Sequence, residues 1–217
     1  PRAAIASSGA EFPKVGAVLE TGAAHAGVEV QHVAVGPRQA PVDVLHLAEV
    51  QRLAAPVLLD YIREKNIKNL TIVSPDVGSV KMGRAFAKRL NAELAIVDKR
   101  RSEKDKSKVM NVIGDVSGRN VVILDDMISS GGTLVQAAEE LKRKGAATVM
   151  ACATHPVFSG DACAYVTNSC LSEVIDTNTL TFDRSRCPKV KVLDVSGILA
   201  ETIHRIHSNE SVSTLFV

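Results

Sequence analysis

Residues 121–133 read VVILDDMISSGGT, four aliphatic residues followed by two aspartates and a loop of small polar residues. An uninterrupted aliphatic run is typical of a parallel strand that is buried on both faces. A helix is predicted directly after the loop, because Leu134, Ala137, Ala138 and Leu141 recur at the spacing of one helical face. Gly145 is expected to end this helix. A strand, a glycine-containing loop and a helix in this order indicate a unit of an α/β sheet.

The same alternation continues on both sides of this unit. Further strands are predicted at residues 28–35, Leu70–Val73, Leu94–Val97, Thr148–Ala153, Glu173–Asp176 and Val190–Leu193. Further helices are predicted at Met82–Leu90, Ile198–His207 and Leu45–Lys65, the last with a polar interruption at residues 49–52 and a break at Pro56. Lys99–Lys108 contains no apolar residue and predicts an exposed, mobile loop. We therefore expect an α/β fold with a parallel sheet flanked by helices, whose ligands bind at the carboxyl ends of the strands.

Composition excludes several functional classes. The chain has 217 residues and a net charge of +2, which is too small to indicate a nucleic acid or an anionic membrane as partner. No apolar run is long enough to span a bilayer, and the first residues lack the apolar stretch of a signal peptide. The spacing of the four cysteines fits no zinc site, so we expect reduced thiols in a cytoplasmic protein. These are Cys152, Cys163, Cys170 and Cys187.

The loop after the aliphatic run has the chemistry of an anion-binding site. Two adjacent glycines allow positive φ angles and a close approach of the backbone to a ligand. Successive amides at a helix N-terminus attract phosphate, hydroxyls add donors, and carboxylates accept from sugar hydroxyls or hold Mg²⁺ through water. An acidic helix cap would be the simpler interpretation, but it needs fewer of these residues. The candidate residues are Asp125, Asp126, Ser129, Ser130, Gly131, Gly132 and Thr133.

This loop resembles that of the type I phosphoribosyltransferase fold, in which it grips a 5-phosphate and the ribose hydroxyls. Wider segments resemble ribose-phosphate diphosphokinases, which make phosphoribosyl diphosphate from ribose 5-phosphate and ATP. The resemblance is dense over residues 53–217, which we interpret as a phosphoribosyltransferase-like C-terminal domain, whereas residues 1–52 are interpreted as a poorly matched remnant of an N-terminal domain. The segments are SPDVGSVKMGRAFAKRL (74–90), IVDKRR (96–101), NVIGDVSGRNVVILDD (111–126), ATHPVFSG (153–160) and SVSTLF (211–216).

The resemblance implies a role for each candidate residue. Asp125 and Asp126 would hold the ribose, and Ser129–Thr133 would hold its 5-phosphate. Lys99 and Arg101 match a basic pair on a mobile catalytic loop. The diphosphate loop would be Asp76, Val77, Gly78 and Ser79, with Asp76 as a ligand of Mg²⁺. His32 is a second candidate metal ligand, although a strand-end histidine explains it equally well.

Three functions remain open at this stage. The first is diphosphate transfer from ATP to ribose 5-phosphate. The second is a phosphoribosyltransferase that consumes phosphoribosyl diphosphate. The third is a non-catalytic partner subunit, since the family's N-terminal motifs for ATP do not appear in the chain. The resemblance also implies a homo-oligomer, a dimer or hexamer, or assembly with full-length homologues.

Overall fold

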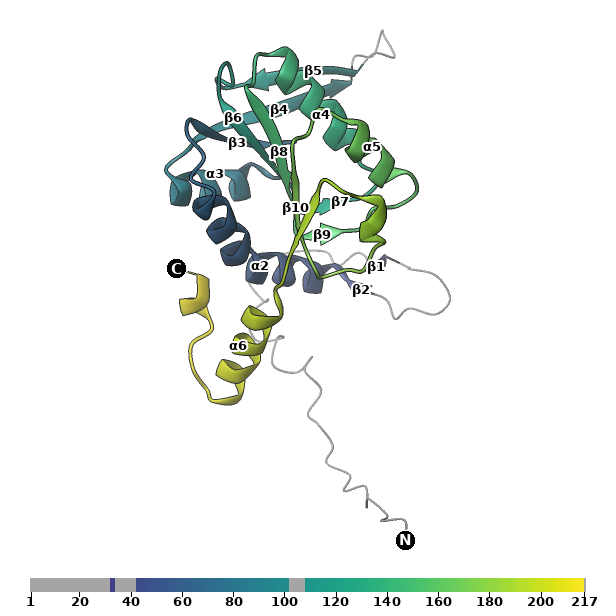
Figure 1. Ribbon diagram of the computed structural model, residues 1–217. Coiled ribbons are helices and arrows are strands. Elements are labelled where there is room, and N and C mark those ends of the chain that lie inside the picture. Colours follow the sequence, from purple (N-terminus) through teal and green to yellow (C-terminus); the bar gives the residue numbers. More distant parts are fainter. Residues whose placement is uncertain (1–31, 34–41, 102–107, 217) are drawn as a thin grey trace. The chain divides into compact units, whose positions relative to one another are not determined.

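The computed structural model describes residues 32–33, 42–101 and 108–216 (Figure 1). It divides into two units, Pro1–His46 and Leu47–Val217. In the first unit, β1 (His32–Val33) pairs antiparallel with β2 (Val42–Asp43), and His32 lies opposite Asp43. The rest of the predicted strand at 28–35 lies outside the described residues. In the described part of the chain, none of the helices is both long enough and apolar enough to cross a membrane.

A single mixed sheet forms the centre of the second unit. Within the described residues it has seven strands in the order β11-β10-β8-β6-β3-β4-β5, and only the edge strand β5 runs antiparallel to its neighbour. The predicted parallel α/β sheet is therefore confirmed, although β5 was not predicted. The strands are β3 (Leu70–Ser74), β4 (Glu93–Arg101), β5 (Lys108–Ile113), β6 (Asn120–Leu124), β8 (Thr148–Cys152), β10 (Val174–Thr177) and β11 (Val190–Leu193).

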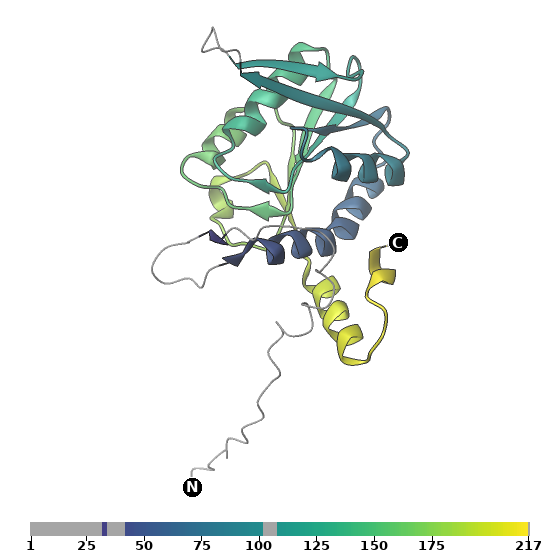
Figure 2. The same cartoon turned by 180° about the vertical axis from the view of Figure 1, so that it is seen from behind.

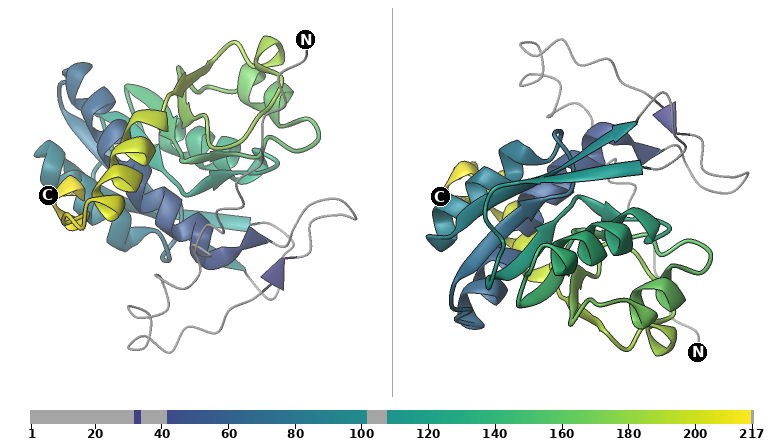
Figure 3. Two further views of the ribbon diagram at one scale, coloured as in Figure 1. Left: turned by 90° about the horizontal axis from the view of Figure 1, so that it is seen from below. Right: turned by 90° about the horizontal axis from the view of Figure 1, so that it is seen from above.

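Helices cover both faces of this sheet (Figure 3). The helices are α2 (Val44–Glu64), α3 (Val80–Leu90), α4 (Gly132–Arg143), α5 (Ala162–Asn168) and α6 (Ser196–His207). α2 and α3 pack on one face, α4 and α5 pack on the other, and α6 lies beyond the end of β11. Short 3-10 turns at Arg184–Arg186 (η1) and Ser213–Phe216 (η2) complete the described elements, with a separate two-stranded pair of β7 (Met127–Ile128) and β9 (His155–Pro156).

The side chains of β6 alternate between two hydrophobic layers, one on each face of the sheet. Val121 and Ile123 belong to the layer under α4 and α5, whereas Val122 and Leu124 belong to the layer under α2 and α3. All four side chains are at most 1% exposed. Burial of a valine, leucine or isoleucine contributes roughly 1.5–3 kcal/mol. This explains why the aliphatic run predicted from the sequence lies in the middle of the sheet.

Two local predictions are wrong. α2 runs through Pro56 without a break, although its axis bends along its length (Figure 2). A proline removes one helical hydrogen bond, but the following turns pack Leu58 and Ile62 into the core and keep the helix intact. The second concerns the ends of the predicted loop at Lys99–Lys108, whose middle (102–107) lies outside the described residues. The backbone of β4 continues to Arg101 because Lys99 pairs with Met110 and Arg101 with Lys108.

The cysteine prediction is also wrong in part. Cys163 on α5 and Cys187, which follows η1, form a disulfide, while Cys152 and Cys170 are free thiols. The two partners are 24 residues apart in sequence. Only the packing of α5 against the segment that follows β10 brings them together, so the spacing of the cysteines gave no sign of the bond.

We expect Gly83→Ala to destabilise the fold. Gly83 is buried on α3, and a Cβ atom there would collide with the Ser74 hydroxyl and lie 3.2 Å from the Leu94 side chain. Overpacking of this kind costs about 1–3 kcal/mol. The control is Gly197→Ala on α6, where a Cβ atom meets nothing within 4 Å. Urea denaturation should show a lower midpoint for the first variant only, and equal midpoints would contradict the close packing of α3 on β3.

Candidate functional site

The strand order reverses between β3 and β6. The chain leaves β3 toward β4 on one side, and it leaves β6 toward β8 on the other. Open α/β sheets bind ligands outside the carboxyl ends of their strands at such a switch point. Asp76 follows β3 and Asp125 follows β6, and the parallel register pairs Val73 with Ile123. The two predicted acidic loops therefore meet at one edge of the sheet.

The phosphate loop (Asp125–Thr133) is held in place by the segment Thr154–Ser159. The Asp126 carbonyl accepts hydrogen bonds from the backbone amides of Thr154 and His155, at 3.1 and 3.0 Å. Further along, the Phe158 amide donates to the Ile128 carbonyl at 2.9 Å and the Ser159 amide to the Ser129 carbonyl at 3.1 Å. The first part of the loop forms β7, which pairs with β9. The backbone of the loop is therefore fixed before any ligand binds.

The end of the phosphate loop presents the N-terminus of α4. Gly131 is the N-cap of this helix, with φ 74°, and it has no side chain to offer to the first amides. Ser129, Ser130 and Thr133 are exposed beside it. The first amides of a helix attract anions. The helix N-terminus and the hydroxyls beside it have the arrangement expected of an anion cradle. The positive φ predicted for Gly132 is wrong, because Gly132 is already the first residue of the helix.

The loop after β3 is built around the Asp76 carboxylate. Its Oδ1 atom accepts a hydrogen bond from the Ser79 amide at 2.8 Å, and the Ser79 hydroxyl donates to the Asp76 carbonyl at 3.2 Å. Ser79 is also the N-cap of α3. Asp76 itself is exposed. Val77 between these residues is 72% exposed.

The two acidic loops line one groove of about 1090 Å³. Asp76, Gly78 and Ser79 contribute from one loop, and Asp125 and Asp126 from the other. The walls come from α2 and α3 and include four basic side chains. These are Arg52, Arg63, Lys81 and Arg89. Sequence reasoning missed these walls, although the polar interruption at residues 49–52 was the signal, since Gln51 and Arg52 line the groove.

Negative charge accumulates at the floor of the groove. The pKa of Asp125 is raised to about 7, chiefly by burial, while a backbone hydrogen bond from Asp126 lowers it and the neighbouring carboxylates of Asp126 and Asp76 raise it. A divalent cation would relieve this repulsion, and Mg²⁺ prefers carboxylate oxygens together with water and phosphate. The donor set thus fits Mg²⁺. Within the described residues, however, no three His, Cys, Asp or Glu side chains form a metal-binding group of their own.

The roles of all the candidate site residues remain predictions, including those of Lys99, Arg101 and His32. Lys99 and Arg101 lie on β4 beyond the last β3–β4 pair, Ser74 with Ile96, so their backbone extends past the carboxyl edge of β3. His32 lies in β1 of the first unit, and its role as a metal ligand stays a prediction.

His155 supports the site and does not line the groove. Its side chain is buried, at 3% exposure, and its Nδ1 atom lies 3.0 Å from the Thr179 hydroxyl. That hydroxyl also donates to the Thr154 carbonyl at 2.9 Å. His155 therefore holds the strip of chain that supports the phosphate loop.

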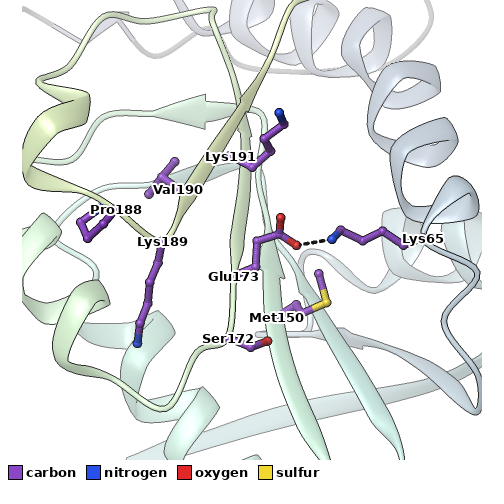
Figure 4. Close-up of a pocket in the computed structure, with 8 residues that line it drawn as sticks. All are labelled: Lys65, Met150, Ser172, Glu173, Pro188, Lys189, Val190 and Lys191. Carbon is purple, nitrogen blue, oxygen red and sulfur yellow. Dashed lines mark ion pairs between the residues drawn. The ribbon is translucent and has the colours of Figure 1, made fainter.

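A second hollow, of about 560 Å³, lies at the opposite, amino end of the strands (Figure 4). Glu173 at its centre accepts hydrogen bonds from the Tyr61 hydroxyl at 2.8 Å and pairs with Lys65 at 2.7 Å. Figure 4 shows Lys65 pointing toward Glu173. Because these polar groups satisfy each other and lie far from the switch point, we assign this hollow a structural role that ties α2 to β10.

Comparisons with known proteins show which family the chain is similar to. A family model described as the phosphoribosyl synthetase-associated domain matches residues 101–217. The ribose-phosphate pyrophosphokinase of Ralstonia nicotianae is 49% identical over 165 residues, which cover 75% of this chain and 52% of that protein. That of a Nostoc species is 46% identical over 183 residues, covering 79% of this chain and 56% of that protein.

A solved structure gives the same result. The phosphoribosylpyrophosphate synthetase from Mycobacterium smegmatis superposes with a TM-score of 0.66 at 35% sequence identity, covering 72% of this chain and 51% of that chain. The chain thus spans about half the length of the relatives that it matches.

We expect Gly131→Ala to weaken the binding of ribose 5-phosphate at least about tenfold, a change of 1.4 kcal/mol. The positive φ of this position is unfavourable for alanine. The backbone would shift to a negative φ and displace the amides of the cradle. The matched control is Gly118→Ala, which has φ 67°, open space around its Cβ and a place outside the loop. Calorimetric titration should separate the two variants. Equal affinities would contradict the cradle at Gly131.

Proposed function

Since the chain belongs to the phosphoribosyl synthetase family, the ribose-phosphate pyrophosphokinases, we propose that its groove transfers diphosphate from Mg²⁺-ATP to ribose 5-phosphate. The observation that carries the proposal is the convergence of Asp76, Asp125 and Asp126 on one groove beside a preformed anion cradle. The products are phosphoribosyl diphosphate and AMP. The oxygen on the anomeric carbon attacks the β-phosphorus of ATP, and the bond to the α-phosphate oxygen breaks.

The phosphate loop binds the sugar phosphate in this proposal. The amides at the start of α4 and the hydroxyls of Ser129, Ser130 and Thr133 donate to the 5-phosphate. Asp125 and Asp126 accept from the ribose hydroxyls. The pKa of Asp125 is raised in the free groove, and a cation or a hydroxyl donor beside it would lower that pKa and favour the ionised form. Binding would therefore orient the sugar and keep the Asp125 carboxyl ionised.

The loop Asp76–Ser79 and the basic pair act on the diphosphate. Mg²⁺, when bound, neutralises the polyphosphate and polarises its oxygens. Asp76 would hold the ion with its other oxygen while its Oδ1 atom keeps the turn closed. Lys99 and Arg101 would stabilise the charge of the transferring group. His32 would be a further metal ligand.

A second role is supported by α6, whose apolar side chains Ile203 and Ile206 are 68% and 52% exposed. Exposed apolar residues on one helix face mark an interaction surface when they adjoin one another. We propose that this face packs against a full-length homologue in the cytoplasm. The chain would then contribute the sugar-phosphate half of a shared site.

We expect the 217-residue chain alone to bind ribose 5-phosphate but to release little AMP. Fixing both substrates contributes about 7–11 kcal/mol to a two-substrate reaction, and the described groove presents no adenine-stacking aromatic among the residues that line it except Phe86, which is buried. Mixing it with a full-length relative, whose own phosphate-loop aspartates are changed to asparagine, should restore AMP release.

The mixture also tests the basic pair. Lys99→Ala with Arg101→Ala in this chain should lower the turnover of the mixture far more than it raises KM, because the pair acts on the transition state. Fast AMP release by the pure chain would contradict the proposal that a full-length homologue completes the site. Absence of both ribose 5-phosphate binding and restored AMP release would contradict the proposed function.

We expect Asp76→Asn to weaken Mg²⁺-dependent binding of diphosphate about tenfold or more. Asparagine keeps an acceptor for the Ser79 amide and removes only the charge. Asp115→Asn is the matched control, because Asp115 accepts the Ser117 amide at 3.0 Å in a similar turn outside the groove. Titration with and without a chelator provides the measurement. Diphosphate that binds equally well in excess chelator would show that Asp76 holds no metal.

A further inference from the structure

The disulfide between Cys163 and Cys187 lies directly behind the phosphate loop. Cys163 is the second residue of α5, and its neighbour Ala162 packs against the loop. The three atoms closest to the position of a Cβ on Gly131 all belong to Ala162, at 3.5–3.7 Å. The Ala162 amide donates to the Ser159 carbonyl at 3.3 Å, and the Ser159 amide donates to the Ser129 carbonyl. The N-terminus of α5 therefore supports the phosphate cradle from behind.

A second strip of chain also supports the loop. This strip, residues 178–187, follows β10 and ends at Cys187. Thr179 holds His155 and Thr154 through its hydroxyl, and the Phe182 ring packs on the Phe158 ring with centroids 4.7 Å apart. Phe158 in turn donates its amide to Ile128 of the loop. The conformation of residues 178–187 thus acts on the phosphate loop through Thr154–Ser159.

The disulfide is the covalent link between these two supports. Between Thr179 and Cys187, only Phe182 is partly buried and the other residues are exposed, so the strip depends on a few anchors. Cys187 is the most buried of these anchors, at 1% exposure, while Cys163 is 8% exposed. Opening the bond would leave both thiols packed as small apolar groups but would free the end of the strip from α5.

We propose that Cys163 and Cys187 form a redox modification site that positions the phosphate loop, so that the disulfide state binds a sugar 5-phosphate more tightly than the dithiol state. The inference rests on the proposed function, because the affected ligand is the one assigned to that loop. Both cysteines are positioning residues, since they act through Ala162, Phe158 and Ser159 and do not reach the ligand.

The interconversion is a thiol–disulfide exchange with a low-molecular-weight thiol. Its thiolate attacks the Cys163 sulfur, the more accessible of the two, and the Cys187 sulfur leaves as a thiolate that takes up a proton. A second thiol then attacks the outer sulfur of the mixed disulfide and releases Cys163. In sum, two thiols lose two electrons and two protons to become a disulfide, and the protein gains two thiols.

The experiment compares the oxidised and the reduced 217-residue chain. Alkylation and mass measurement verify two free thiols in the oxidised state, Cys152 and Cys170, and all four in the reduced state. Calorimetric titration then measures the affinity for ribose 5-phosphate and, separately, for Mg²⁺ with diphosphate. We expect reduction to weaken ribose 5-phosphate binding at least about fivefold, the lower end of coupling between sites, and to leave diphosphate binding at the Asp76 loop unchanged.

Two variants serve as controls. Cys163→Ala should bind ribose 5-phosphate as the reduced chain does, with or without reductant. Cys170→Ser removes an exposed free thiol and should respond to reductant like the original chain. Circular dichroism verifies that each form is folded at the assay temperature.

The outcomes separate the inference from the function on which it rests. Equal ribose 5-phosphate affinity in both redox states overturns the inference alone. A reduced chain that is unfolded also overturns it, because the bond would then hold the whole fold. Failure of both states to bind ribose 5-phosphate overturns the inference together with the proposed function.

Discussion

The parallel pairing of β3 with β6 is the interaction on which the rest of this structure depends. It brings together two segments that are about fifty residues apart, and both side-chain layers of the sheet pack on these two strands. Because the strand order reverses there, the loops that follow the two strands have no helix between them. Asp76 and Asp125 face one groove for this reason, and a shift of the register would move one loop away from the other. The aliphatic core of β6 thus fixes the geometry of the acidic groove floor.

The phosphate loop needs support from outside its own βα unit. Glycine at position 131 and small polar residues give it access to a ligand but little packing of their own. Its conformation is supplied by backbone hydrogen bonds from Thr154–Ser159, which are fixed in turn by Thr179, Phe182 and α5. A binding loop that is already held in place loses less conformational entropy when the ligand arrives. This dependence makes a remote feature such as the disulfide relevant to the affinity of the loop.

The sequence alone predicted an element correctly wherever its pattern of apolar side chains is compatible with only one secondary structure. The unit of β6 and α4 follows from the aliphatic run and from Leu134, Ala137, Ala138 and Leu141, all of which are buried. The pairing of the end of β4 with β5 was missed because Lys99–Arg101 pair through their backbone with Lys108–Met110, and the basic, polar sequence here gives no alternating pattern typical of a strand. Similarly, only tertiary packing joins Cys163 to Cys187 and places α2 opposite α3 around the groove. The positive φ assigned to both glycines belongs to Gly131 alone, since a pair of glycines does not reveal which of them begins the helix.

The central claim is that the loop of residues 129–133 and the start of α4 bind the phosphate of a phosphorylated ribose. Two-dimensional amide NMR of the isotopically labelled chain tests it most directly, by titration with ribose 5-phosphate and, in parallel, with unphosphorylated ribose. The structure predicts saturable shifts of the amides of Ser129–Thr133 with ribose 5-phosphate and much smaller shifts of the same amides with ribose. Shifts confined to other parts of the chain, or the same response to both sugars, would contradict the claim.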